Sequence, residues 1–163
     1  EDKNIALKLS KVDIRVLTEN IIKLFETKAS VKGLKLILQI EEGFPKIKVD
    51  PFKIEQVFIN LIDNAIKYTD EGYVKVNIYQ RDERAVLEVI DSGKSIPKEH
   101  YSRIFERFYT IDKSHSRKLG GTGLGLSIVK HIVLLHNGEI SLDSNNGNGN
   151  KFIVSLPLKS KKR

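Results

Sequence analysis

The stretch of residues 50–69 constrains the fold of this chain more than any other, because it predicts a helix that is buried over most of its circumference. Asp50 is a favourable N-cap residue, and Pro51 suits the first position of a helix. The apolar residues that follow recur at helical spacing and cover more than the usual single stripe. They are Ile54, Val57, Phe58, Leu61, Ile62, Ala65 and Ile66. We therefore expect this helix to lie inside the fold.

A row of polar residues interrupts this apolar helix. Its spacing of three or four residues places the row along one side of the helix, and its members are Gln56, Asn60, Asn64 and Lys67. Buried carboxamides need partners. A hydrated cation that holds phosphate oxygens would supply them, with Lys67 neutralising the phosphate. A polar seam that hydrogen-bonds to neighbouring loops would explain the same row without a ligand.

The length and composition indicate one globular domain with a core of its own. The chain has 163 residues, 40% of them hydrophobic. We expect the domain to cover residues 1–158 and a basic, disordered tail to follow at residues 159–163. The formal net charge is +7, but this tail supplies much of it, and no cluster of aromatic and basic residues predicts nucleic-acid binding.

Missing residue types exclude further classes. The absence of cysteine excludes a disulfide scaffold and thiolate metal sites. No apolar run reaches the ~20 residues that a membrane span needs, and no signal peptide opens the chain, so we expect a cytoplasmic location. Because the chain does not begin with methionine, we expect it to be a piece of a longer protein, whose membrane anchoring is left open.

Hydrophobic periodicity predicts an α/β fold. Strands are expected over residues 6–14, 34–40, 73–80, 84–90, 139–143 and 151–157, and helices over residues 16–31, 50–69, 97–105 and 127–136. This order predicts a two-layer sandwich, with a mixed β-sheet and helices on one face. Residues 110–119 are polar and basic without periodicity, which is typical of a mobile lid over an anion or of an ordinary exposed loop.

Glycines at positions 120, 121, 123 and 125 directly precede the last predicted helix. Their backbone N–H groups can approach a phosphate closely and meet the positive end of the helix. The pattern is neither a P-loop nor a dinucleotide fingerprint, and such glycines can also form mere turns.

Two further motifs lie between the helices. Asp91 follows a predicted strand and precedes Gly93, so it can accept a hydrogen bond from an exocyclic amine, although Asp-Ser-Gly is also a common turn. The segment of residues 104–109 alternates aromatic and charged residues, which is compatible with a packed corner or with the hinge of a lid.

Together these stretches match one family in order and spacing. Residues 60–69, NLIDNAIKYT, resemble the N box of sensor histidine kinases, and Asp91-Ser92-Gly93 resembles the first half of their G1 box. Residues 105–109, FERFY, resemble the F box, and residues 121–126, GTGLGL, resemble the G2 box. The resemblance covers nearly the whole chain. It implies the Bergerat-type ATP-binding fold, which gyrase, the mismatch-repair MutL proteins and a heat-shock chaperone share more distantly.

The resemblance also implies roles for individual residues. Asn64 would be the principal Mg²⁺ ligand, with Asn60 beside it. Lys67 and Tyr68 would contact phosphate or ribose, and Asp91 would bind the adenine amino group. The implied ATP site comprises Asn60, Asn64, Lys67, Tyr68, Asp91, Gly93, Ile96, Phe105, Phe108, Tyr109, Lys118, Gly121, Thr122, Gly123, Leu124, Gly125 and Leu126.

Three positions depart from the family's pattern. In the G1 box, Ser92 replaces an asparagine and Ser95 replaces a glycine, so backbone strain at Ser95 could alter the loop that binds adenine. Thr110 stands where many members carry an arginine that reaches the γ-phosphate.

Another cation must then face the γ-phosphate. Arg107 is a candidate, but we expect it in a structural ion pair. We therefore predict Arg117 as the catalytic clamp, with Lys118 second, because both precede the phosphate-binding glycines and a planar guanidinium matches phosphate best. The alternative is that these are solvated charges without a role.

No histidine of the chain resembles the phospho-acceptor of these kinases, which precedes an acidic residue. The four histidines, His100, His115, His131 and His136, precede Tyr, Ser, Ile and Asn, so we expect them on the surface or in structural roles. We expect the catalytic half of an ATP-dependent protein histidine kinase, with its dimerisation domain N-terminal to residue 1.

The function that the resemblance implies is transfer of the γ-phosphate of Mg²⁺-ATP to a histidine of that dimerisation domain. The parent would be a homodimer that signals to a cognate response regulator. A degenerate module that docks to other domains with little phosphotransfer is one alternative. An ATP-driven clamp is another, but such clamps use a glutamate at the first N-box position, which is Asn60 here.

Overall fold

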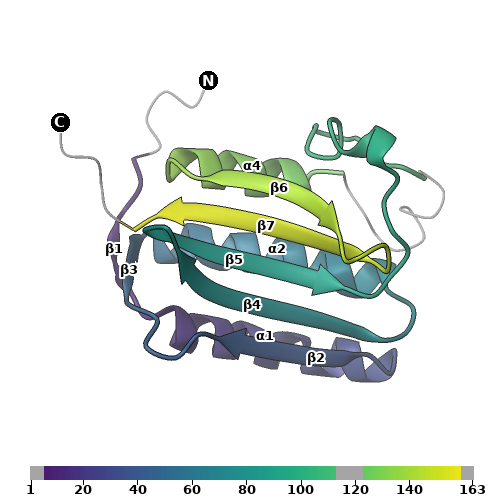
Figure 1. Ribbon diagram of the computed structural model, residues 1–163, viewed down its shortest axis with the longest axis horizontal. Helices are drawn as coiled ribbons and strands as arrows, with labels where there is room; N and C mark the ends of the chain where they lie inside the picture. The colour runs from purple at the N-terminus through teal and green to yellow at the C-terminus, as the bar shows by residue number, and fades with distance from the viewer. Residues whose placement is uncertain (1–5, 113–122, 159–163) are drawn as a thin grey trace.

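The structure is a computed structural model that describes residues 6–112 and 123–158. A five-stranded sheet carries its helices on one face (Figure 1). In chain order the elements are β1 (Ser10–Val12), α1 (Ile14–Val31), β2 (Lys35–Ile40), β3 (Ile47–Val49), α2 (Pro51–Tyr68), β4 (Tyr73–Arg81), β5 (Arg84–Asp91), a 3₁₀ turn (Lys98–His100), α4 (Gly125–Leu135), β6 (Glu139–Ser144) and β7 (Asn150–Pro157).

The sheet is mixed, as the sequence predicts. Its strand order is β2-β4-β5-β7-β6, with β2 and β4 parallel and every other neighbouring pair antiparallel. Both predicted hairpins, β4–β5 and β6–β7, are therefore confirmed. The last strand, β7, lies between β5 and β6, so the sheet is completed by the segment that comes latest in the described chain.

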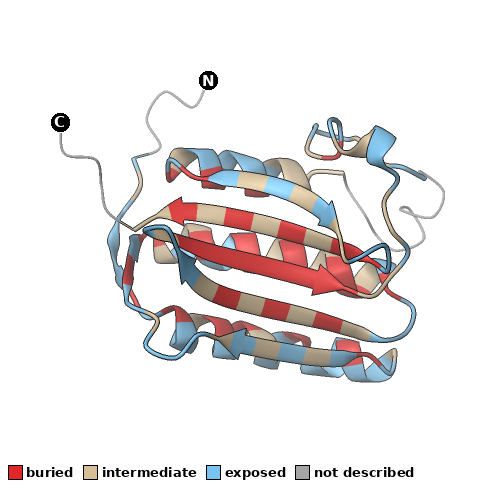
Figure 2. Ribbon diagram, viewed as in Figure 1, coloured by how far each residue is buried: buried red, intermediate tan, exposed pale blue. Residues whose placement is uncertain are grey.

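The core lies between the sheet and α2, which packs against α1 and α4 in the helical layer. All the predicted apolar residues of α2 are buried. They face the inner side chains of β4, β5 and β7, and Figure 2 shows β5 buried along almost its whole length. The central helix is thus where the sequence places it.

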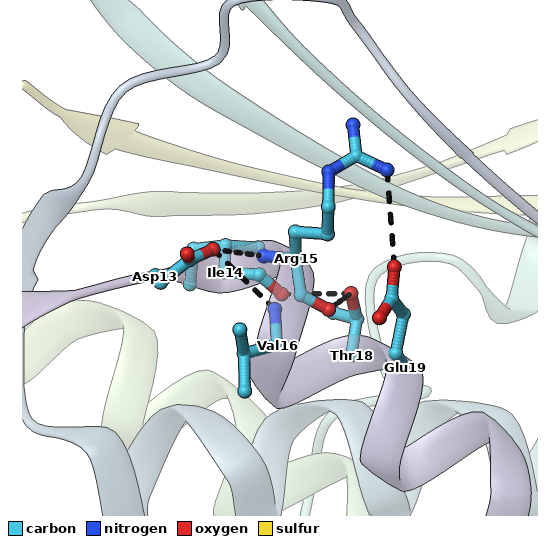
Figure 3. Close-up of polar contacts among 6 residues, drawn as sticks. All are labelled: Asp13, Ile14, Arg15, Val16, Thr18 and Glu19. Atoms are coloured by element: carbon cyan, nitrogen blue, oxygen red, sulfur yellow. Dashed lines mark hydrogen bonds and ion pairs between the residues drawn. The ribbon is translucent and has the colours of Figure 1, made fainter.

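The first predicted strand is too long, because its end caps a helix instead. Only Ser10–Val12 forms a strand, and it pairs with β3 in a separate two-stranded sheet. Asp13 then caps α1, since its Oδ1 accepts from the backbone N–H groups of Arg15 and Val16 (Figure 3). The hydroxyl of Thr18 donates to the Ile14 carbonyl, 2.7 Å away, within the first turn. The helix therefore starts earlier than residue 16.

Two other elements differ from their predictions. β3 is not predicted, because three residues are too few to show a period. The helix predicted over residues 97–105 shrinks to the 3₁₀ turn Lys98–His100, followed by turns. α4 begins at Gly125, inside the glycine motif, rather than at residue 127.

Asp50 ties three segments together at the start of α2. Its Oδ1 accepts from the N–H groups of Phe52 and Lys53, as expected of the cap, and its Oδ2 accepts from the backbone N–H of Lys8 at 3.0 Å. The Asp50 N–H donates to Nε2 of His136, 3.1 Å away at the end of α4. Burial raises the pKa of Asp50, but these N–H donors and the nearby His136 outweigh burial and lower it. The start of α2 is thus fixed to the end of α4, and the two helices run antiparallel.

Candidate nucleotide-binding site

The two predicted amide ligands lie half-buried on α2, beside the start of α4. Asn60 Nδ2 donates to the Gly125 carbonyl over 3.4 Å, which matches the polar-seam alternative in part. Asn64 makes no hydrogen bond within the described part of the chain, so its amide is available to a ligand. Amide oxygens are suitable ligands for a hard cation such as Mg²⁺, and the pair therefore fits a metal-phosphate group.

The other polar residues of the row have different surroundings. Gln56 is exposed. The ammonium of Lys67 lies 2.9 Å from Oδ2 of Asp63, which also faces Lys28 at 3.6 Å. A phosphate would have to draw Lys67 away from this ion pair. Tyr68 ends the helix with 39% of its surface exposed.

A cluster of polar groups surrounds Asp91 at the end of β5, and this aspartate is only 5% exposed. Oδ1 of Asp91 accepts from the Gly93 N–H at 2.9 Å and from Asn150 Nδ2 at 3.2 Å. Oδ2 has no hydrogen bond among the residues that the structure describes. Burial raises the pKa of Asp91, although hydrogen bonds from the Gly93 backbone and from the side chain and backbone of Asn150 act against this effect. The carboxylate therefore has one oxygen held and one oxygen free for a donor.

Thr69 adds a hydroxyl without a partner to this polar cluster. The residue is fully buried, and its Oγ1 has no partner within residues 6–112 and 123–158. A Cβ at Gly93 would lie 2.9 Å from this oxygen and 3.0 Å from the Tyr68 carbonyl, so only glycine allows the loop to approach α2 this closely. Buried polar groups normally have partners. The free Asp91 oxygen and the orphaned hydroxyl together fit the polar edge of an adenine ring.

The two G1-box departures are accommodated by hydrogen bonds. The hydroxyl of Ser92 accepts from the Tyr73 N–H at 2.9 Å, and that of Ser95 accepts from the Gly149 N–H at 3.0 Å. Neither serine is among the described residues with positive φ. The strain considered for Ser95 is therefore absent, and the altered loop is a well-bonded structure that keeps Asp91 in place. The degenerate-module alternative loses its main support.

The F-box segment joins the glycine motif to the core. The Phe105 ring packs edge-on against Phe152, with ring centroids 6.1 Å apart. The Phe108 N–H donates to the Gly123 carbonyl at 2.7 Å, and a Cβ at Gly123 would lie 2.7 Å from the Phe108 Cα. Phe108 itself is 65% exposed with φ of 63°. Part of the segment is thus a packed corner, whereas Phe108 faces outward.

Ion pairs in this segment differ from the expectation. Glu106 pairs with Arg103 at 3.3 Å, and not with Arg107, whose guanidinium lies over the Phe108 ring. His100 Nδ1 contacts the Tyr109 hydroxyl, a structural role like the one expected. The Thr110 hydroxyl is buried without a partner in the described part of the chain.

The remaining predicted residues are only partly described. Ile96 and Leu126 pack against the core, and the Leu124 carbonyl accepts from the hydroxyl of Ser127 at 2.8 Å. Four predicted residues lie outside the described ranges, and they are Arg117, Lys118, Gly121 and Thr122. His115 also lies outside these ranges.

Two residues of the polar cluster around Asp91, Thr69 and Asn150, are not among the predicted site residues. Thr69 is the last residue of the N-box stretch, which is a local signal that could have drawn attention to it. Asn150 ends a turn rich in Asn and Gly, and nothing in that pattern separates it from its neighbours. Its contact with Asp91 spans 59 residues.

Comparison with known proteins identifies the family to which this chain belongs. Residues 49–160 match the family of histidine kinase-, DNA gyrase B- and HSP90-like ATPases. The chain belongs to this family. The match covers α2, the Asp91 loop, the glycine motif and β7. The domain is therefore an ATP-binding domain, and the Bergerat-type sandwich expected from its motifs is confirmed.

Within the ATPase family, the similar proteins are sensor histidine kinases. The chain is 42% identical over 116 residues to sensor histidine kinase WalK of Bacillus subtilis, covering 69% of this chain and 19% of that protein. Full-length ShkA in complex with AMPPNP superposes with a TM-score of 0.86 at 28% identity, over 98% of this chain and 33% of ShkA. Histidine kinase ThkA, in complex with response regulator protein TrrA, gives 0.82 at 29% identity, over 99% of this chain and 45% of ThkA.

This ATPase domain is thus of the kind that histidine kinases use for catalysis. It spans only 19 to 21% of the length of the first curated relatives that it matches. Among its described residues, none of the helices has the length and hydropathy required to cross a bilayer.

Proposed function

We propose that this domain binds Mg²⁺-ATP and transfers the γ-phosphate to a histidine of a dimerisation domain in a two-component sensor kinase. The observation that carries the proposal is the polar cluster at Gly93, where Asp91 keeps one carboxylate oxygen without a hydrogen bond and the Thr69 hydroxyl has no partner among the described residues. The amino group of an adenine base can donate to the Asp91 oxygen, and a ring nitrogen can accept from the Thr69 hydroxyl. The similarity to ShkA, which was solved with AMPPNP, supports the same ligand class.

The residues of α2 and α4 hold the other end of the nucleotide in this proposal. Asn64 and Asn60 are the metal ligands, and Lys67 and Tyr68 contact phosphate or ribose. The glycine motif, up to Gly125 at the start of α4, offers backbone N–H groups to the phosphates. The bound Mg²⁺ neutralises phosphate charge. The site acts in the cytoplasm, where ATP is abundant.

The transfer itself needs little covalent chemistry from this chain. A nitrogen of the acceptor imidazole forms a bond to the γ-phosphorus, the bond from that phosphorus to the β–γ bridging oxygen breaks, and ADP leaves with the electron pair. The imidazole N–H proton is released to solvent. Catalysis therefore rests on positioning and on charge stabilisation. The parent is a homodimer, and a response regulator receives the phosphate, which the assembly of ThkA with TrrA supports.

The first prediction tests whether this domain supplies catalysis while a separate dimerisation domain supplies the acceptor histidine. The isolated domain should not label itself when given γ-labelled ATP, because none of its histidines resembles an acceptor, but it should label a separately supplied dimerisation domain of its own parent. Acid-labile phosphate is measured on both chains, with a dimerisation domain whose acceptor histidine is replaced by alanine as the control. Stable acid-labile label on the isolated domain would refute the proposal.

The second prediction concerns the proposed γ-phosphate clamp. Replacing Arg117 by alanine should slow transfer by ~10-fold or more and weaken ATP binding, since the guanidinium faces charge on the transferred group. ADP affinity should hardly change, because ADP lacks that group. Single-turnover transfer and calorimetry measure these effects, with Arg15→Ala, an exposed arginine of α1, as the matched control. Equal losses for ATP and ADP would assign the clamp to another residue.

A further inference from the structure

Asn150 is a buried polar residue that the proposed chemistry does not use. It is the first residue of β7, lies opposite Asp91 in the β5–β7 ladder and is 6% exposed. Its Nδ2 donates to Oδ1 of Asp91 at 3.2 Å and to the Lys94 carbonyl at 3.0 Å, and its Oδ1 accepts from the Ile96 N–H at 2.8 Å. One side-chain amide is therefore bonded to the base-binding carboxylate and to both ends of the segment 94–96.

These partners permit only one orientation of the amide. Two acceptors, the carboxylate and the Lys94 carbonyl, face Nδ2, and one donor faces Oδ1. A flipped amide would set oxygen against two oxygens and an NH₂ group against an N–H. The contact with Asp91 is thus a fixed donor bond rather than one of several rotamers.

The turn before Asn150 brings this amide to the loop. A Cβ at Gly149, where φ is 129°, would lie 1.9 Å from the Asp91 carbonyl oxygen, so no other residue allows the same approach. The Ser95 hydroxyl bonds to Gly149, and Asn145 Nδ2 donates to the Tyr73 hydroxyl at 2.7 Å. The β6–β7 turn is therefore attached to the Asp91 loop at several points.

We propose that Asn150 is a positioning residue for base recognition: it holds Oδ1 of Asp91 so that Oδ2 is presented to the exocyclic amine of the nucleotide. The inference rests on the proposed function, since it assigns the source of specificity in the same site. Asn150 does so as a neutral donor, which fixes the carboxylate without removing the negative charge that the amine needs.

The charges around Asp91 determine what would follow if the neutral side chain of Asn150 were replaced by a carboxylate. The elements packed around Asp91 carry titratable side chains at Tyr68, Tyr73, Lys94 and Lys151. The shift in the pKa of Asp91 comes from burial and from its own hydrogen bonds, and not from these groups. A carboxylate introduced at position 150 would therefore face Asp91 without a compensating cation, and the two carboxylates would share a proton at lower pH.

The first test compares ADP with inosine diphosphate, which carries an oxygen in place of the exocyclic amine. In calorimetric titrations, the wild type should prefer ADP by ~10-fold or more. Asn150→Ala should lower ADP affinity by ~10-fold while changing inosine diphosphate affinity by less than ~3-fold. Partial unfolding would weaken both nucleotides by one factor and leave their ratio unchanged, so the ratio isolates positioning. An unchanged ratio would overturn the inference.

The second test compares the pH profiles of ADP affinity for Asn150→Asp and for the wild type. ADP affinity should rise on acidification in this variant, because one shared proton restores the donor at position 150. In the wild type it should fall as the pH decreases through the raised pKa of Asp91, because this carboxylate then becomes protonated. Asn148→Asp is the matched control, since this exposed asparagine adds the same charge to the same turn and should keep the wild-type profile. Parallel profiles for wild type and Asn150→Asp would refute the inference, whereas absence of nucleotide binding in the wild type would instead refute the proposed function.

Discussion

Replacing Asp91 by alanine is expected to weaken ATP binding by ~10²-fold or more, because a site built to bond the exocyclic amine loses its acceptor. The fold should survive this change. Burial raises the pKa of Asp91, so its ionised form is disfavoured in the folded state relative to the unfolded chain. Removing the carboxylate therefore relieves this cost at neutral pH, while it leaves the N–H of Gly93 and the amide of Asn150 without their shared acceptor.

Calorimetric titration with ATP and GTP measures the effect. The matched control is Glu88→Gln, which alters another buried acid of β5 whose carboxylate bonds to Asn77 and Tyr79. Glu88 points to the opposite face of the sheet, because side chains alternate along a strand, so its replacement should leave ATP binding unchanged. Comparable binding of GTP and ATP by the wild type would contradict the role of Asp91.

The sign of the pH dependence follows from the same carboxylate. Since the pKa of Asp91 in the folded domain lies above 3.8, ATP affinity should fall as the pH decreases through that raised pKa. The alanine variant should bind weakly with little dependence on pH over the same range. A loss of wild-type affinity on alkalinisation instead would have to come from another group.

Replacing Asn64 by alanine should abolish the Mg²⁺-dependent part of ATP binding and reduce phosphoryl transfer by ~10²-fold or more, because the metal loses a ligand and the phosphates lose neutralisation. Asn64 is the half-buried amide of α2 that has no hydrogen bond in the described part of the chain. Its replacement therefore breaks no hydrogen bond within the described part of the chain. The effect should thus be confined to ligand binding and to transfer.

Titrations with Mg²⁺ and with a chelator separate metal-dependent from metal-independent binding. Asn20→Ala, an exposed asparagine of α1, is the control for a lost carboxamide on a helix. In the Asn64→Ala variant, the affinities measured with and without Mg²⁺ should coincide. A persistent gain in affinity on adding Mg²⁺ would mean that the cation is held by other residues.

The sequence predicts the fold well where one element carries a complete pattern. Residues 50–69 contain their own cap, period and apolar surface, and α2 matches them closely. The two hairpins are equally local. Asp13 is predicted poorly, because alternation suggests that the strand continues. Its side chain instead accepts from the N–H groups of Arg15 and Val16 and caps a helix. β3 is too short to show any period.

The site could be predicted only in part, for a different reason. Asp91, Asn60 and the glycines belong to short motifs, whose order is visible in the chain. The contacts that shape the site are long-range: Asn60 contacts Gly125, and Asp91 contacts Asn150. The first pair depends on the packing of α2 against α4 and the second on strand order, and no local sequence pattern specifies either. The roles of Arg117 and Lys118 stay predictions, since both lie outside the described residues.

Because β7 lies between β5 and β6 in the sheet, the sheet cannot be completed on the ribosome until β7, the last strand, has been translated. A nascent chain that has emerged only as far as β6 has the glycine motif and Asp91, but its sheet is interrupted where β7 belongs. The partner of Asp91 and the ring against which Phe105 packs, Asn150 and Phe152, are still to come. The set of contacts around Asp91 is therefore complete only after β7 has been translated.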